Sequence, residues 1–96
     1  MEQIKWTTKS LKDLKAINDF ISLDSKFYAA RFINRLIQRV DQLVLFPDSG
    51  RIVPEKNNPE IRELIEGNYR IFYRQHKNFI TILRIHNAAK RIRKEI

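Results

Sequence analysis

The chain has 96 residues, no cysteine and a net charge of +8. This length predicts one domain, residues 1–96, and the lack of cysteine excludes disulfides, thiolate catalysis and cysteine zinc sites. No apolar run approaches the roughly 20 residues of a membrane span, and no hydrophobic signal segment opens the chain. We therefore expect a cytoplasmic protein that does not bind a membrane.

Residues 2–6 alternate in polarity, which predicts a short strand. Thr7 or Thr8 can cap the helix that follows, and Ser10 and Asp13 also have the spacing of a capping box. This helix is predicted to end near residues 22–23, with Asp13 among the side chains that face water. Its core-facing stripe consists of Leu11, Leu14, Ile17 and Ile21.

A second helix is predicted after Asp24 or Ser25, either of which can cap it. Its apolar stripe has a period of 3.6 residues, and Pro47 cannot continue the helix. Two helices joined by so few residues form an antiparallel hairpin. The stripe comprises Ala29, Phe32, Ile33, Leu36, Ile37, Val40, Leu43 and Val44.

Residues 47–60 hold all three prolines and Gly50, and they predict a long irregular connection of the kind that often carries function. Three strands are predicted next, at 61–66, 69–75 and 79–86, with a two-residue turn at Gly67-Asn68. Alternation in the last strand opposes Phe79, Thr81, Leu83 and Ile85 to Ile80, Ile82, Arg84 and His86.

The predicted order is strand, helix, helix, strand, strand, strand. Such segregated elements indicate an α+β fold in which the helical hairpin covers one face of an antiparallel-rich sheet. The other face is then more open, and Arg70, Arg84 and His86 are expected to point toward it.

Positive charge gathers toward the C-terminus. Residues 84–96 contain five basic side chains and one acidic side chain, a net charge of +4. Such a cluster favours nucleic acid, a ribosome or an acidic protein as partner. The basic tail, at about residues 87–96, is either a target-binding segment or a loose, solvated end. The candidate target-binding residues are Lys90, Arg91, Arg93 and Lys94.

Five segments occur in a fixed order between Ile4 and about Arg91. They are Trp6-Thr7-x-x-Ser10-Leu11-x-Asp13-Leu14, then Leu43-x-x-Phe46-Pro47-x-x-Gly50-Arg51-x-Val53-Pro54-Glu55, then Ile61-Arg62-Glu63-Leu64, then Asn68-Tyr69-Arg70-Ile71-x-Tyr73, and finally Ile82-Leu83-Arg84-Ile85-His86. Together they resemble the ParE branch of the RelE/ParE toxin superfamily.

The resemblance implies a RelE/ParE-like β-α-α-β-β-β fold and the toxin half of a type II toxin–antitoxin system, which serves plasmid stabilisation and inhibits growth. It also implies a small antitoxin, encoded alongside, that binds the toxin in a hetero-oligomer. Two targets are associated with the superfamily: ParE-like toxins poison DNA gyrase, and RelE-like toxins cut messenger RNA in the ribosomal A site.

Metal-independent RNA cleavage needs a base, cations beside the phosphorus and an acid for the leaving oxygen. In some RNA-cleaving relatives, Glu, Arg and His lie at positions resembling Glu55, Arg70 and His86. Those relatives have an aromatic residue where this chain has Asn87. RelE-like endonucleases that rely on several lysines in the loop and second strand also fit poorly, because Lys56 is the only lysine between residues 47 and 76. The candidate catalytic residues are Glu55, Arg62, Arg70, Arg84 and His86.

Each candidate also has a structural interpretation. Glu55 can pair with a neighbouring cation, Arg62 and Arg70 can bind nearby glutamates, and His86 can bind the backbone. Two distant histidines make a poor ligand set, so neither a metal nor a cofactor is expected. The departures from the RNA-cleaving relatives, at Asn87 and in the number of lysines, favour a gyrase-inhibiting toxin. The alternatives are a ribosome-dependent messenger-RNA endonuclease and a non-toxic binding module of the same fold.

Overall fold

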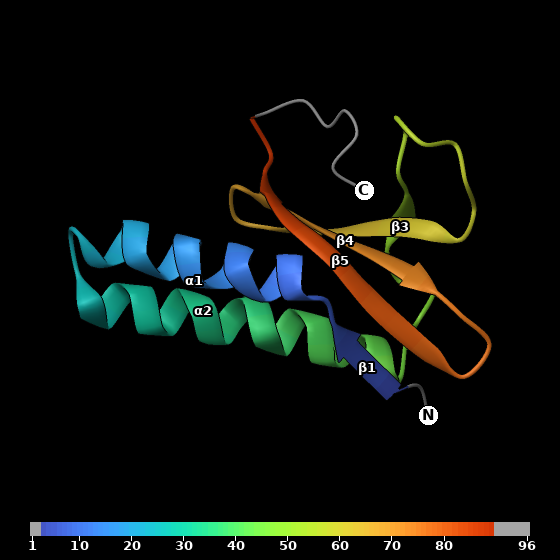
Figure 1. Ribbon diagram of the computed structural model, residues 1–96, viewed down its shortest axis with the longest axis horizontal. Helices are drawn as coiled ribbons and strands as arrows, with labels where there is room; N and C mark the ends of the chain where they lie inside the picture. Colours follow the sequence, from blue (N-terminus) through green and yellow to red (C-terminus); the bar gives the residue numbers. More distant parts are fainter. Residues whose placement is uncertain (1–2, 90–96) are drawn as a thin grey trace.

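The structure is a computed structural model that describes residues 3–89. Its helices α1 and α2 run side by side as a hairpin, and the sheet lies against them (Figure 1). The elements in chain order are β1 (Gln3–Trp6), α1 (Thr8–Ser22), α2 (Lys26–Asp41), the 3-10 turn η1 (Gln42–Val44), β2 (Arg51–Ile52), β3 (Ile61–Glu66), β4 (Tyr69–Gln75) and β5 (Phe79–Asn87). The predicted α+β class and element order are confirmed. The two-residue β2, inside the connection at 47–60, is an addition to them.

The sheet has the strand order β1-β5-β4-β3-β2. Strand β1 pairs with β5 in parallel, and every other neighbouring pair is antiparallel. Gly67 makes the predicted turn between β3 and β4 with φ +57°, in the left-handed region that glycine adopts at little cost. The three C-terminal strands thus form the middle of the sheet, and the N-terminal strand forms one edge.

Side-chain caps begin both helices. The Thr7 hydroxyl accepts a hydrogen bond from the Ser10 backbone N–H at 3.0 Å, and the Ser10 hydroxyl donates to the Thr7 carbonyl at 2.8 Å. Ser25 caps α2 by accepting from the Tyr28 N–H at 3.0 Å. The predicted caps Thr7 and Ser25 are confirmed. The capping box that starts at Ser10 is wrong, because Ser10 already lies inside α1.

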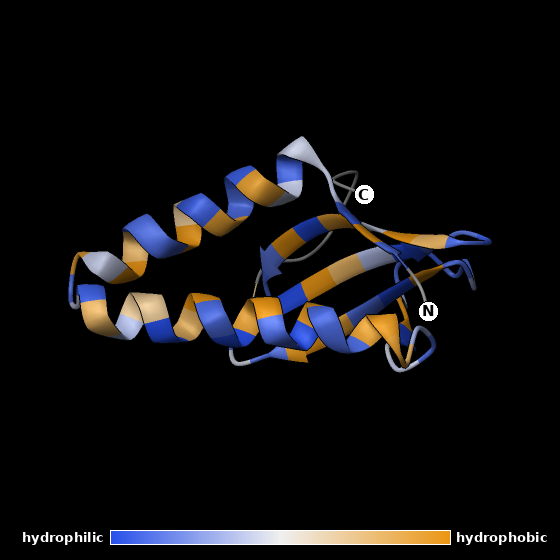
Figure 2. Cartoon of the chain, turned by 90° about the horizontal axis from the view of Figure 1, so that it is seen from below, coloured by the Kyte–Doolittle hydropathy of each residue, from blue (hydrophilic) through white to orange (hydrophobic). Residues whose placement is uncertain are grey.

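The main core lies between the hairpin and one face of the sheet. Apolar and hydrophilic segments alternate along both helices (Figure 2), as an amphipathic stripe requires. Leu11, predicted to face the core, is exposed instead, whereas Ile17 is buried. The buried members of this core are Ile17, Phe32, Leu36, Val40, Leu43, Leu64, Ile71, Tyr73, Ile80, Ile82 and Ile85.

A second, smaller core covers part of the opposite sheet face. Val53, Ile61 and Phe72 are buried there, and Leu83 packs against them. The pairing of β4 with β5 shifts at this point: Tyr73 lies opposite Ile82 and Phe72 lies opposite Arg84, so that Leu83 is skipped. The extra residue of such a bulge reverses the alternation that follows it. The predicted faces of β5 are therefore wrong beyond Ile82.

Within residues 3–89, no helix is both long enough and apolar enough to cross a bilayer.

Candidate functional site

The site is centred on Arg70, the second residue of β4, on the sheet face away from the helices. Strand register places Arg70 between Ile65 of β3 and His86 of β5. A shallow pocket of about 250 Å³ opens beside it, and Arg51, Pro54, Glu55, Ile65, Arg70 and Ala88 line this pocket. Two regular strands therefore hold the arginine in place, and the irregular 53–60 segment supplies one wall.

Two carboxylates bind the Arg70 guanidinium. Glu55 accepts two hydrogen bonds, from Nη1 at 2.9 Å and from Nη2 at 2.8 Å. Glu63 accepts from Nε at 2.9 Å and from Nη2 as well. The guanidinium carbon also lies 4.8 Å from the centre of the Phe72 ring. Arg70 is buried, and its donors are largely occupied by protein groups.

The ion pairs extend to Arg51, which donates from Nε to Glu63 at 2.7 Å. We call these four side chains, Arg51, Glu55, Glu63 and Arg70, the arginine–glutamate network. Two positive and two negative charges give it a formal charge of zero. Glu63 is fully buried whereas Glu55 is partly exposed. Glu63 is thus the interior counter-ion of Arg70, and Glu55 is a second one at the surface.

The network sets the protonation state of its members. The hydrogen bonds from Arg70 lower the pKa of Glu55 from 4.5 to about 2, despite an opposing effect of burial. In the other direction, the hydrogen bonds to Glu55, followed by those to Glu63, raise the pKa of Arg70. A general base works best with a pKa near the working pH. Glu55 in this arrangement is a firmly ionised counter-ion and a poor proton acceptor.

Arg62 lies on the helix-covered face, because its cross-strand partner is Tyr73 of the main core. There its Nη1 donates to the Gly50 carbonyl at 2.8 Å. The Tyr73 hydroxyl accepts from the Gly50 N–H and donates to the Pro47 carbonyl, both at 2.9 Å. Arg62 and Tyr73 thus anchor the start of the 47–60 connection, on the opposite side of the sheet from Arg70.

Arg84 is bound to α1. Its Nε and Nη2 donate to the two oxygens of Asp13 at 2.7 and 2.9 Å, and the Ile85 N–H donates to the same carboxylate at 3.0 Å. Strand β1 ends opposite Ile82. Beyond that point the Asp13 carboxylate, and not a β1 carbonyl, accepts the hydrogen bond from the Ile85 N–H at the edge of β5. The expectation that Asp13 faces water is wrong for this reason.

His86 lies beside Arg70 in the strand register. Its Nε2 is buried and has no hydrogen-bond partner in the part of the chain that the structure describes. Of the five candidate catalytic residues, Glu55, Arg70 and His86 therefore share one region, while Arg62 and Arg84 are engaged elsewhere. The four candidate target-binding residues Lys90, Arg91, Arg93 and Lys94 lie outside the described residues.

Two acidic residues that bind the candidate arginines, Glu63 and Asp13, were not singled out from the sequence. In β3, Glu63 lies on the same face as the apolar Ile61. A charged residue on an apolar strand face is a signal for a buried ion pair. Asp13 lies between Ser10 and Ile17 on the buried side of α1. No group of three or more His, Asp or Glu side chains within residues 3–89 could hold a metal ion.

Known proteins resemble this chain in sequence and in fold. Residues 4–92 match the family model described as the ParE toxin of the type II toxin–antitoxin system parDE. Toxin RelE2 of Caulobacter vibrioides is 35% identical over 91 residues, which cover 94% of this chain and 99% of that protein. A chain of the chromosomal ParDE TA system from P. aeruginosa superimposes with a TM-score of 0.74 and 28% identity, over 91% of this chain and 96% of that chain.

Proposed function

This chain belongs to the ParE toxin family of type II toxin–antitoxin systems, and from that premise we propose that it inhibits growth by binding DNA gyrase. The observation that carries the choice is the arginine–glutamate network. Inhibition by binding needs a recognition surface and no general base, so a neutral, internally paired cluster is compatible with it.

RNA cleavage makes demands that the network meets poorly. The transition state gathers negative charge on the phosphorus, and free cations must stabilise it. Arg70 is bound by Glu55 and Glu63, and Arg51 by Glu63. A phosphate would have to displace a carboxylate from Arg70, and Glu55, with a pKa of about 2, would accept a proton weakly. These are reasons to favour the binding mechanism.

The target-binding surface that we propose includes the basic residues Lys90, Arg91, Arg93 and Lys94. The argument for them is their charge: four cations within five positions favour an acidic protein face or the phosphates of gyrase-bound DNA. The chain is also proposed to act with an antitoxin that binds it and neutralises it, since the matched family and the solved relative both come from ParDE systems.

The test sets two assays on one protein preparation. In the first, the protein is added to gyrase and relaxed plasmid, and supercoiling or accumulation of cleaved DNA is followed. In the second, it is added to programmed ribosomes, and A-site cuts in the messenger are mapped. We expect gyrase inhibition and intact messenger. Cut messenger with unimpaired gyrase would refute the proposal.

Ribosome-dependent RNA cleavage is the second candidate function. Its support is the position of His86, whose buried Nε2 is without a partner among the described residues and lies on the strand next to Arg70. A histidine can donate a proton to a leaving oxygen near neutral pH. His86→Ala separates the two functions: the substitution should abolish A-site cutting if cutting occurs, and it should leave gyrase inhibition intact.

A further inference from the structure

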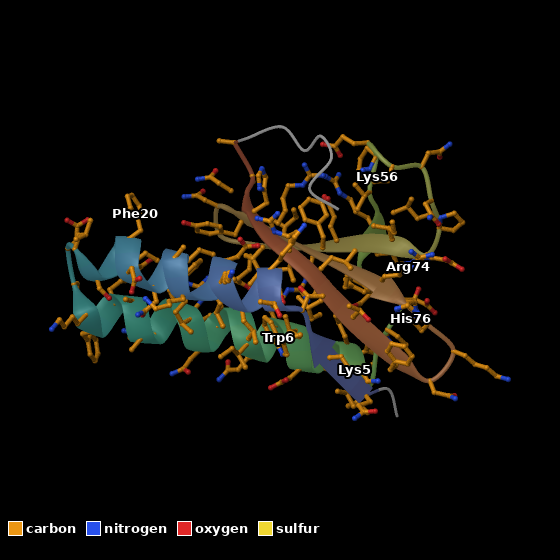
Figure 3. The ribbon with its side chains drawn as sticks, in the orientation of Figure 1. Lys5, Trp6, Phe20, Lys56, Arg74 and His76 are labelled. Atoms are coloured by element: carbon orange, nitrogen blue, oxygen red, sulfur yellow. The ribbon has the colours of Figure 1, made fainter. Side chains whose placement is uncertain are left out.

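The two glutamates that bind Arg70 are held differently. Glu63 belongs to strand β3 and its side chain is fully buried, whereas Glu55 belongs to an irregular loop and its side chain is 31% exposed. Figure 3 shows the loop residue Lys56 at the sheet end of the molecule, far from Phe20 on the helical hairpin. Glu55 binds both terminal nitrogens of Arg70, and Glu63 binds Nε and Nη2. Glu55 is therefore the partner that can leave the guanidinium while the interior ion pair stays intact.

The loop is secured to the sheet on either side of Glu55. Val53 is buried in the smaller core, on the sheet face away from the helices. At the other end of the loop, the Glu60 carbonyl accepts a hydrogen bond from the Gln75 N–H at 3.0 Å. Between these two anchors, the Glu55 side chain binds Arg70. A loop that is fixed at both ends can lift Glu55 away from Arg70 without detaching from the sheet.

Departure of Glu55 would uncover a cationic pocket. The depression of about 250 Å³ has Arg51 and Arg70 in its lining, with Pro54 and Ile65 as apolar walls. The arginine–glutamate network is neutral while Glu55 is in place, and it has a formal charge of +1 without that carboxylate. Arg51 is 62% exposed, so an anion that takes the place of Glu55 can reach both arginines. The pocket is thus an anion site whose ligand at rest is part of the protein.

The chemistry of the two arginines selects the anion. A guanidinium binds a carboxylate or a phosphate with two parallel hydrogen bonds. Glu55 is tethered beside Arg70, and a tethered group acts at an effective concentration on the order of millimolar, so a free carboxylate of equal charge competes poorly. A phosphate monoester carries about −1.5 to −2 charges at neutral pH and has three acceptor oxygens, so it can bind Arg51 as well as Arg70. A phosphodiester carries a single charge and lacks this advantage.

We propose that Glu55 is a latch on a phosphate-binding pocket: when its carboxylate leaves Arg70, a dianionic phosphate group, either free phosphate or a phosphate monoester, takes its place and binds Arg70 and Arg51 together. The neutral network is the closed form of this pocket, and residues 54–59 are the part that moves. No covalent bond is made or broken and no general base is needed. The inference is therefore independent of the target on which the toxin acts.

The first test is a titration with inorganic phosphate at neutral pH and constant ionic strength, followed by the NMR signal of the Arg70 Nε–H. Glu55→Ala opens the latch. Glu60→Ala is the matched control, because it removes the same charge from the same connection but takes it from an exposed pair with Arg74. We expect Glu55→Ala to bind phosphate at least tenfold more tightly than the wild type, and Glu60→Ala to bind it within twofold of the wild type. Equal affinities of the two variants would overturn the proposal.

The wild type offers a second measurement, which needs no substitution. Saturating phosphate should shift the NMR signal of the Glu55 carboxyl carbon, because that group leaves Arg70, and it should leave the signal of the buried Glu63 carboxyl in place. A Glu55 signal that stays unchanged while phosphate shifts the Arg70 signal would show that phosphate does not displace the latch, and the proposal would fall.

Arg51 tests whether two arginines hold the phosphate. Added to Glu55→Ala, the substitution Arg51→Ala should weaken phosphate binding at least fivefold. Arg74→Ala, which changes an exposed arginine outside the lining of the pocket, should alter it less than twofold in the same background. Glu63 keeps Arg70 as its partner in both double variants. Unchanged binding after Arg51→Ala would refute a site that the two arginines share.

Two forms of one short single-stranded DNA separate the sources of phosphate. The terminally phosphorylated form has a monoester at its end, whereas the unphosphorylated form has diesters alone. If the ligand is the end of a nucleic acid, Glu55→Ala should bind the phosphorylated form at least fivefold more tightly. If it is free phosphate, the two forms should bind equally and neither should displace inorganic phosphate. Displacement by the unphosphorylated form would show that a diester is sufficient, and this outcome would overturn the choice of a dianion.

These measurements use the toxin alone, so they are distinct from the test of the proposed function. Failure of Glu55→Ala to gain phosphate binding would refute the latch and leave gyrase inhibition untouched. A wild-type chain that spares gyrase, together with a Glu55→Ala variant that gains phosphate binding, would refute the proposed function and leave the latch standing.

Discussion

Both carboxylate oxygens of Glu55 bind the guanidinium of Arg70, at 2.8 and 2.9 Å. This ion pair joins an irregular loop to the middle strand of the sheet. Paired hydrogen bonds between planar groups are among the stronger and more directional contacts in proteins. The contact therefore orders the loop, and it also occupies the arginine that an RNA-cleaving site would need free.

The two glutamates of the network should differ in their effect on stability. Glu63→Ala removes a fully buried partner of Arg70, and loss of one member of a buried pair costs about 3 kcal/mol. Glu55→Ala removes a partly exposed partner, for which the cost is about 1 kcal/mol or less. Urea unfolding of the two variants measures the difference. Equal losses would contradict the division into an interior and a surface counter-ion.

Glu55 should also make stability depend on pH. Its pKa is about 2 in the folded protein and 4.5 ordinarily, so the folded state favours the ionised form. The stabilisation is present above about pH 4.5, and it declines as the pH falls toward 2 because the folded protein then binds the proton less readily than the unfolded chain. Thermal unfolding between pH 2 and 6 measures this, and Glu55→Gln should flatten the curve in that window.

Asp13 should stabilise the fold more than any exposed acid on the same helix. Its carboxylate accepts three hydrogen bonds, two from Arg84 and one from the Ile85 N–H. A hydrogen bond to a charged group contributes about 1.5–3 kcal/mol to the free energy of unfolding. We expect Asp13→Ala to lower the free energy of unfolding by about 2–3 kcal/mol.

Asp19→Ala is the control for this prediction, since Asp19 pairs only with the exposed Lys15 at 2.8 Å among the described residues. Chemical denaturation should show a change below about 0.5 kcal/mol for Asp19→Ala, as is usual for exposed pairs. A similar change in both variants would show that Asp13 does not secure α1 to β5.

Toxicity should depend on the basic tail and not on His86. If the chain acts by binding, His86→Ala leaves growth arrest unchanged, whereas joint replacement of Lys90, Arg91, Arg93 and Lys94 by alanine weakens it, because the charge that attracts the target is gone. Growth curves after induction, at matched amounts of soluble protein, measure both. His86→Ala is a cleaner probe than Arg70→Ala, which would leave Glu63 buried without its partner. Loss of toxicity in His86→Ala alone would favour the nuclease.

Much of the fold follows from local pattern. The 3.6-residue stripe of α2, the caps at Thr7 and Ser25, and the Gly67-Asn68 turn all depend on residues a few positions apart. The strand boundaries at 61–66 and 69–75 follow from alternation and turn residues. These features are predictable because secondary structure has short periods and short-range hydrogen bonds.

The tertiary structure alone decided which charges meet. Asp13 and Arg84 are 71 positions apart, and nothing in their local sequence indicates the pair. The bulge at Leu83 reverses the faces of β5 beyond Ile82, which the regular alternation of the sequence does not reveal. The sequence offered nearby glutamates as partners of Arg70, but only the fold shows that Glu63 is the fully buried one and Glu55 the partly exposed one. The sequence by itself determined the two helices, the four longer strands and the family. The contacts of the site depend on register and packing between distant segments, which no local spacing encodes.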